Sequence, residues 1–67
     1  MMEGIDGLSP KQGEIMELVV KGLKTDAIAS SLGCSPETVK VHLSEIYRRL
    51  GVSGRVEAVV VWLNEAR

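Results

Sequence analysis

The stretch from residue 25 to residue 50, TDAIASSLGCSPETVKVHLSEIYRRL, constrains the fold of this chain more than any other. Gly33 interrupts it, and Ser35 followed by Pro36 is a typical helix start, with serine as the N-cap and proline at the first helical position. Beyond that start, apolar residues recur at helical spacing, namely Val39, Leu43, Ile46 and Leu50. The stretch therefore predicts a short helix, a tight turn and a longer helix with one apolar face and one polar face.

The rest of the chain carries similar helix signals. Ser9 and Pro10 begin another apolar helical pattern, and Gln12 stands three residues after the cap, where it can complete a capping box. Gly22 ends that helix, and Thr25 is expected to cap the next one. We therefore predict an all-α fold, a four-helix bundle that contains the helix-turn-helix, with helices over about residues 10–21, 26–32, 36–50 and 55–66.

The size and composition of the chain are those of one small domain. With 67 residues and 45% hydrophobic content, the chain is expected to fold around a single, marginal core. Residues 1–7 show no apolar periodicity, which predicts a disordered tail. The folded helix-turn-helix domain is then expected over residues 8–67.

Several functional classes lack the residues that they need. One cysteine and one histidine make neither an intrachain disulfide nor a metal site. Neither a nucleophile–base pair nor a phosphate-binding loop is visible, so neither an enzyme nor a bound cofactor is expected. The sequence also shows no signal peptide and no apolar run of the ~20 residues that cross a membrane. A cytoplasmic protein that does not enter the membrane is therefore expected.

The predicted last helix, over residues 55–66, is apolar on nearly every side. A surface helix of a monomer needs a polar face. One side of this helix is therefore expected to pack on the domain and another to bind a second copy of the chain. The candidate residues for this homodimer contact are Val56, Val59, Val60 and Leu63. The sequence does not tell which of them face the partner and which face the core.

The positive charge of the chain concentrates on its predicted third helix. The net charge of −1 disfavours a nucleic-acid partner, but residues 36–55 carry a local charge of +2. The face opposite the apolar stripe carries Lys40, Val41, Ser44 and Arg48. Such a helix can enter the major groove of double-stranded DNA, where Lys40 could reach a guanine or a phosphate and Val41 a thymine methyl group. Spacing alone does not separate this role from that of an ordinary solvated helix face.

Polar residues near the predicted helix starts add to this candidate surface. Helix N-termini expose unpaired N–H groups that bind phosphates, although ordinary capping explains the same residues. His42 is expected to brace the third helix or to donate to a phosphate. Tyr47 is expected to be partly buried, or to place its hydroxyl near the DNA backbone. The candidate DNA-binding residues are Lys24, Thr25, Ser35, Thr38, Lys40, Val41, His42, Ser44, Tyr47 and Arg48.

Three stretches of the chain resemble one known family. They are LSPKQ at residues 8–12, GLKTDAIASSLGCSPETVKVHLSEIYRRLGV at 22–52 and GRVEAVVVWL at 54–63, and the spacing of TVKVH, RRLGV and RVEAV within them is specific. The chain resembles the LuxR/NarL-type, or GerE-like, helix-turn-helix DNA-binding domain of bacterial transcription regulators. This resemblance implies a four-helix domain whose third helix reads DNA and whose fourth helix forms a two-fold dimer on it.

The resemblance also implies roles for individual residues. It places base contacts at Lys40, Val41 and Ser44, and phosphate contacts near the starts of the second and third helices and along the third. Ser44 is shorter than the basic or polar side chains common in relatives, which implies shorter or water-mediated base reading there. Gly13 and Gly54 stand where relatives often have better helix-forming or capping residues, which implies modest stability. In relatives this domain usually follows a phosphoryl-receiver domain, as in response regulators, or a small-molecule-sensing domain.

Two other functions remain open. A promoter-recognition module like region four of a sigma factor has a similar helix-turn-helix and would bind RNA polymerase, although the apolar helix after RRLGV argues against it. A dimeric protein-interaction module without DNA binding would explain the acidic net charge and the short side chain of Ser44.

Overall fold

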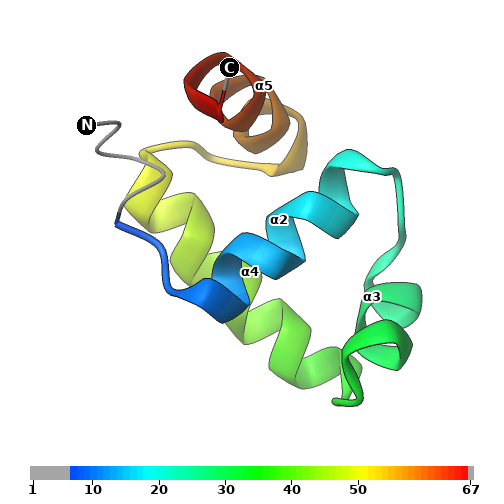
Figure 1. Cartoon of the computed structure of the whole chain (residues 1–67). Coiled ribbons are helices and arrows are strands. Elements are labelled where there is room, and N and C mark those ends of the chain that lie inside the picture. Colours follow the sequence, from blue (N-terminus) through cyan, green and yellow to red (C-terminus); the bar gives the residue numbers. More distant parts are fainter. Residues whose placement is uncertain (1–6, 67) are drawn as a thin grey trace.

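The computed structural model describes residues 7–66, and the regular structure within that range is helical. The helices are α2 (Pro10–Val20), α3 (Thr25–Leu32), α4 (Pro36–Leu50) and α5 (Arg55–Ala66). Figure 1 shows α2 crossing α4 at the centre, with α3 and α5 at opposite ends of this pair. The predicted all-α fold is confirmed for these residues, although α2 ends and α3 begins one residue earlier than predicted. The tail predicted over residues 1–7 lies, apart from Gly7, outside the described residues and stays a prediction.

Serine caps begin two of the helices as the sequence predicts. At the start of α2, the Gln12 backbone N–H donates to Ser9 Oγ at 3.2 Å, and the Ser9 N–H donates to Gln12 Oε1 at 3.1 Å. This reciprocal pair is the predicted capping box. At the start of α4, Ser35 Oγ accepts from the Thr38 N–H at 3.2 Å. Each serine satisfies a helix N–H that would otherwise have no partner within the helix.

The predicted cap of α3 is wrong by one residue. Thr25 is the first residue inside α3, and Lys24 is the N-cap, with extended backbone angles φ −79° and ψ 164°. The Lys24 carbonyl already accepts the first helical hydrogen bond, from the Ile28 N–H at 2.9 Å. A lysine side chain has no acceptor atom, so it cannot satisfy the first N–H groups of α3. The start of this helix is therefore left without a side-chain cap.

Glycines with a left-handed backbone end α3 and α4. Gly33 and Gly51 both have φ of 72°, a conformation that glycine adopts without a steric penalty. The next residue then reaches back along the helix: the Cys34 N–H donates to the Ala29 carbonyl at 3.0 Å, and the Val52 N–H donates to the Tyr47 carbonyl at 2.9 Å. This hydrogen-bond pattern satisfies carbonyls in the last turn of each helix. At Gly33 it also makes the tight turn that redirects the chain from α3 into α4.

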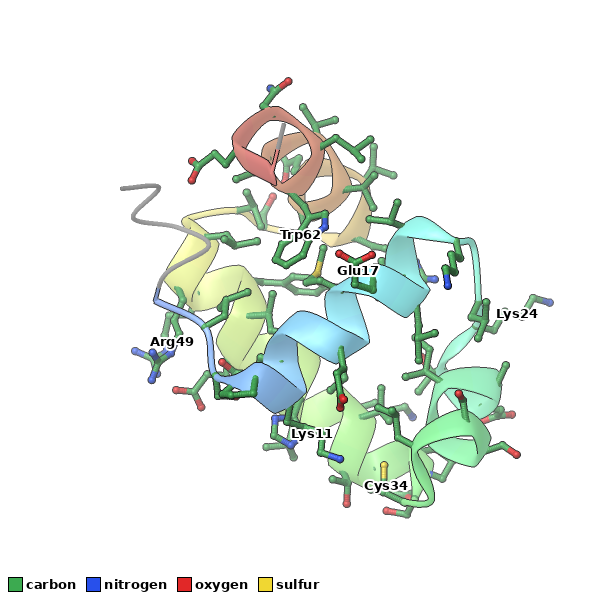
Figure 2. All side chains as sticks on the ribbon, in the orientation of Figure 1. Lys11, Glu17, Lys24, Cys34, Arg49 and Trp62 are labelled. Carbon is green, nitrogen blue, oxygen red and sulfur yellow. The ribbon has the colours of Figure 1, made fainter. Side chains whose placement is uncertain are left out.

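All four described helices contribute to one aliphatic core around a single tryptophan. Its buried members are Ile15, Met16, Val19, Ile28, Ala29, Val39, Leu43, Ile46, Ala58 and Trp62. The ring of Trp62 lies between α5 and α2 (Figure 2) and is 7% exposed. The free cysteine, Cys34, is half-buried against this core in the turn before α4. The predicted apolar stripe of α4 is thus confirmed, with Leu50 only partly buried.

Two arginines join segments that are distant in the sequence. The Arg49 guanidinium donates through Nη1 to the carbonyl of Gly7, which fixes the entry of the chain against the end of α4. The Arg55 guanidinium donates through Nη2 to the carbonyl of Leu23, which ties the start of α5 to the loop between α2 and α3. No helix within the described range has the length and apolar content that a membrane crossing requires.

Candidate nucleic-acid interface

The buried side of α4 determines which of its residues face outward. The inward residues are Val39, Leu43 and Ile46. An α-helix has 3.6 residues per turn, so residues four apart share a face. The exposed residues of α4 that lie away from the buried stripe and along one face are Lys40, Val41, Ser44 and Arg48, which we call the α4 ridge. Within the ridge, Val41 is 68% exposed, which leaves an apolar side chain among polar ones.

Glu45, at the edge of the α4 ridge, binds two neighbouring arginines. One oxygen, Oε2, accepts from Arg48 Nη2 at 3.0 Å and from both Nε and Nη2 of Arg49 at 3.2 Å. The local charge of +2 over residues 36–55 is therefore not freely available, because one carboxylate is shared between two guanidinium groups. Lys40 is exposed on the same face and has no ion pair among the described residues.

The starts of α3 and α4 carry the other predicted phosphate contacts. Lys24 is exposed and projects away from the helices (Figure 2), while the next residue, Thr25, is half-buried. Ser35 and Thr38 are exposed, and their hydroxyl oxygens lie 3.0 Å apart, within hydrogen-bond distance. Because the eight residues of α3 separate the two starts, about 12 Å of helix lies between them. The two groups can therefore contact two different phosphates rather than one.

His42 and Tyr47 lie beside the α4 ridge rather than within it. Both side chains are half-buried, and Tyr47 packs against the core. Tyr47 is therefore partly buried, as predicted from the sequence. Its position and that of His42 suit residues that support the ridge from the side.

The apolar residues of α5 divide between the core and the surface. Ala58 and Trp62 are buried and Val59 is half-buried against the core, whereas Val56, Val60 and Leu63 are exposed. Val59 therefore belongs to the inward side of α5, and the other three dimer candidates form its outward side. We call Val56, Val60 and Leu63 the α5 apolar face.

The start of α5 is held by a glutamate rather than by a serine cap. Glu57 Oε1 accepts from the Ser53 hydroxyl at 2.5 Å and from the Ser53 backbone N–H at 3.0 Å. These hydrogen bonds lower the pKa of Glu57 below the ordinary value of 4.5, chiefly through the Ser53 side chain. The Ala58 N–H donates to the Gly54 carbonyl at 3.0 Å, which is the first hydrogen bond of α5. Gly54 thus occupies the cap position, and Glu57 reaches back past it to Ser53.

The described residues form a surface site rather than an enclosed one. Residues 7–66 contain no pocket, and no three metal-ligating side chains come together among them. What the arrangement offers is an exposed helix face with donors and one apolar group, beside the uncapped start of α3 and the serine-capped start of α4. An exposed helix of this kind suits a partner with a groove that the helix can enter, such as a nucleic acid.

Comparison with known proteins assigns the chain to a family. Residues 6–62 match the family described as bacterial regulatory proteins, luxR family. The chain belongs to this family. The match covers α2, α3 and α4 and most of α5, so it includes the α4 ridge and the start of the α5 apolar face. The luxR family is one of regulatory proteins and not of enzymes.

Several curated relatives of this luxR-family chain are named as regulators. The transcriptional regulatory protein YdfI of Bacillus subtilis is 44% identical over 54 residues, which are 81% of this chain and 25% of YdfI. The nitrate/nitrite response regulator protein NarL of Escherichia coli is 33% identical over 63 residues, which are 94% of this chain and 29% of NarL. A putative HTH-type transcriptional regulator of Mycobacterium bovis is 39% identical over 56 residues, which are 84% of this chain and 6% of the relative. This chain therefore spans less than a third of each of these relatives.

Three residues of this luxR-family chain shape the candidate interface without having been predicted to do so. From the sequence, Glu45, Arg49 and Arg55 were counted only in the local charge of residues 36–55. The signal for Glu45 was present, because arginines three and four residues later on a helix lie within reach of one carboxylate. No comparable signal exists for the backbone contacts of Arg49 and Arg55, whose carbonyl partners lie 42 and 32 residues away.

Proposed function

We propose that this luxR-family chain binds double-stranded DNA sequence-specifically and regulates transcription, with α4 as the recognition helix in the major groove. The observation that carries the proposal is the α4 ridge. It places donors and one exposed apolar side chain along a single helix face that the packing of α4 leaves open. A helix of this kind fits the width of the major groove, where each base pair displays a distinct pattern of donors, acceptors and methyl groups.

The chemistry of the α4 ridge matches what base pairs present. The Lys40 ammonium group can donate to guanine O6 or N7, and Val41 can pack against a thymine methyl group. Val41 is 68% exposed, and packing its apolar side chain against a methyl group would be favourable because it removes apolar surface from water. Ser44 is exposed one turn after Lys40 and reaches less far, so it would read a base through a short or water-mediated contact.

Phosphate contacts would orient α4 in the groove. The start of α3 has free N–H groups because Lys24 provides no side-chain cap, and an anion can occupy that position. Lys24 and Thr25 would hold one phosphate there, and Ser35 and Thr38 a second at the start of α4. Arg48 lies further along α4 and would reach the backbone only when it leaves its pair with Glu45, while His42 and Tyr47 would support the helix or donate to a phosphate.

The α5 apolar face supports a homodimer. Val56, Val60 and Leu63 lie on the side of α5 that faces away from the core, and no described residue of the same chain covers them. A second copy that packs its own α5 on this face would bury both sets of residues. A two-fold dimer would then read two half-sites, about 10 base pairs apart if both α4 helices enter the same side of the duplex.

The relatives favour this proposal over its alternatives. YdfI and NarL are named as regulators, and the family match covers the helix-turn-helix together with α5. A sigma-factor module would not need the α5 apolar face. As a regulator, the chain would act in the cytoplasm, contact RNA polymerase at a promoter, and serve as the output part of a response regulator of the kind that NarL is named for.

A DNA titration with one ridge variant tests the proposal. Wild-type protein and Lys40→Ala are titrated against two duplexes at several salt concentrations. One is the selected duplex, which is the sequence that the wild type prefers in a random pool, and the other is a mixed-sequence duplex. If Lys40 reads a base, Lys40→Ala should lose about 1–3 kcal/mol on the selected duplex and much less on the mixed one. If it contacts a phosphate, the loss should be similar on both duplexes.

The control is Lys11→Ala, which removes the same charge from α2, where Lys11 already pairs with Glu14. Lys11→Ala should bind like the wild type. Folded wild-type protein that fails to bind either duplex at low salt contradicts the proposal. Self-association without salt-dependent DNA affinity would instead favour the protein-interaction module.

A further inference from the structure

We infer that Glu45 limits the DNA affinity of α4 by holding Arg48 away from the phosphate backbone. The inference rests on the proposed DNA-binding function. It concerns a residue that does not itself contact DNA in that proposal but determines whether a neighbouring cation is free to do so. Glu45 therefore acts as a positioning residue for the α4 ridge.

The geometry gives Glu45 two arginines on one oxygen. Oε2 lies 3.0 Å from Arg48 Nη2 and 3.2 Å from both Nε and Nη2 of Arg49. All three are hydrogen bonds between charged groups, and each is longer than the about 2.7–2.9 Å of the tightest pairs of this kind. The two nitrogens of Arg49 approach the carboxylate together, whereas Arg48 offers one.

The two arginines differ in how firmly they are held. Arg49 also donates through Nη1 to the Gly7 carbonyl, so both sides of its guanidinium are bound. Arg48 has no second partner among the described residues, and its side chain is 75% exposed against 46% for Arg49. Arg49 thus keeps the carboxylate of Glu45 in place beside α4, and Arg48 is the arginine that can exchange partners.

A DNA phosphate and Glu45 compete for Arg48. Both present anionic oxygens, and a guanidinium group that donates to one is less available to the other. Arg49 keeps the carboxylate of Glu45 in place beside α4. This negative charge also repels the approaching phosphates. Both effects act in one direction, so Glu45 should weaken binding on any DNA sequence rather than select among sequences.

The test measures affinity for one labelled mixed-sequence duplex across a salt series. Glu45→Ala should bind about threefold to tenfold more tightly than the wild type at low salt, because Arg48 becomes free to contact a phosphate. The slope of log affinity against log salt concentration should steepen by about one unit, the signature of one added phosphate contact. Glu45→Gln, which keeps an acceptor oxygen without the charge, should show a smaller gain in the same direction.

Arg48 must carry most of this gain. In an Arg48→Ala background, adding Glu45→Ala should change the affinity by less than about twofold, because the other arginine that Glu45 binds, Arg49, is still held by the Gly7 carbonyl. A matched control is Glu14→Ala, which breaks an ion pair with Lys11 at the same three-residue spacing on α2 and removes the same charge. Glu14→Ala should leave both the affinity and the salt slope as in the wild type. Circular dichroism of each variant verifies that it is folded.

Three outcomes overturn the inference by itself, without affecting the proposed function. Equal gains with and without Arg48 would show that Glu45 acts through net charge alone. A gain of the same size in Glu14→Ala would show the same. Weaker binding by Glu45→Ala would show that Glu45 presents Arg48 to DNA instead of withholding it. If the folded wild type and all variants fail to bind at low salt, the proposed function fails and the inference falls with it.

Discussion

The indole ring of Trp62 lies over Gly13, so that α5 and α2 meet at a position without a side chain. A Cβ atom built on Gly13 would lie 4.0 Å from Cη2 of Trp62, which is ordinary van der Waals contact. Nothing closer surrounds that position, and Gly13 lies within α2 without a left-handed backbone. The glycine is therefore not needed for the close approach of the two helices.

Gly13→Ala should stabilise the fold. Glycine within a helix costs about 1 kcal/mol relative to alanine, because glycine loses more backbone conformational entropy when the chain folds. The added methyl group would also contact the Trp62 ring without displacing it. We expect the free energy of unfolding to rise by about 1 kcal/mol, which corresponds to a rise of roughly 4–8 °C in Tm for a domain of this size. Thermal unfolding followed by circular dichroism measures it.

Gly33→Ala is the matched contrast, since it makes the same chemical change where the backbone is left-handed. At φ of 72° a Cβ atom is strained although nothing lies within 4 Å of it. This variant should lose about 1 kcal/mol or more. If Gly13→Ala were also destabilising, the Trp62 contact would have to be tighter than the structure shows.

Much of the fold follows from periodicity and capping in the sequence. The inward stripe of α4 and the serine caps at Ser9 and Ser35 were predicted, because these features depend on residues within one or two helical turns. The error at Thr25 has a local cause. A threonine there suits both the cap and the first turn, and the extended backbone of Lys24 decides between them.

The division of α5 into two sides could not be read from the sequence. This helix is apolar on nearly every side, so its periodicity does not define which residues turn inward. The packing of Trp62 against α2 decides it, placing Val59 toward the core and Val60 toward the surface. The contact of Arg55 with Leu23 leaves no periodic trace either, because its partners lie 32 residues apart in the sequence.

The stability of α5 should depend on pH through Glu57. Its folded pKa is lowered from the ordinary 4.5, first by the Ser53 hydroxyl and then by the Ser53 backbone N–H. A carboxyl group with a lowered folded pKa stabilises the fold above its unfolded pKa, and this contribution is lost as the pH falls through 4.5 toward the folded value. The wild type should therefore lose stability over that window by more than Glu57→Gln does.

Thermal unfolding at a series of pH values, from neutral to below 4.5, measures the effect. The Tm difference between the wild type and Glu57→Gln should be largest at neutral pH and shrink on acidification. Ser53→Ala removes the largest cause of the lowered pKa and should reduce the same pH dependence. Curves that stay parallel over the whole range would contradict this account of the α5 start.

Self-association should depend on the α5 apolar face and not on exposed valines in general. Val60 is 52% exposed on α5, and Val41 is 68% exposed on α4, so each can be changed to glutamate without opening the core. Val60→Glu should weaken self-association in sedimentation experiments while the helical circular dichroism is retained, because a charge would be buried between two copies. Val41→Glu, the same change on the α4 ridge, should leave self-association intact and weaken DNA binding through repulsion by phosphates.

Two results would contradict this account. The dimer is refuted if the wild type stays a monomer at high protein concentration and binds paired half-sites no better than single ones. The placement of the dimer contact on α5 is refuted if the two variants affect self-association equally.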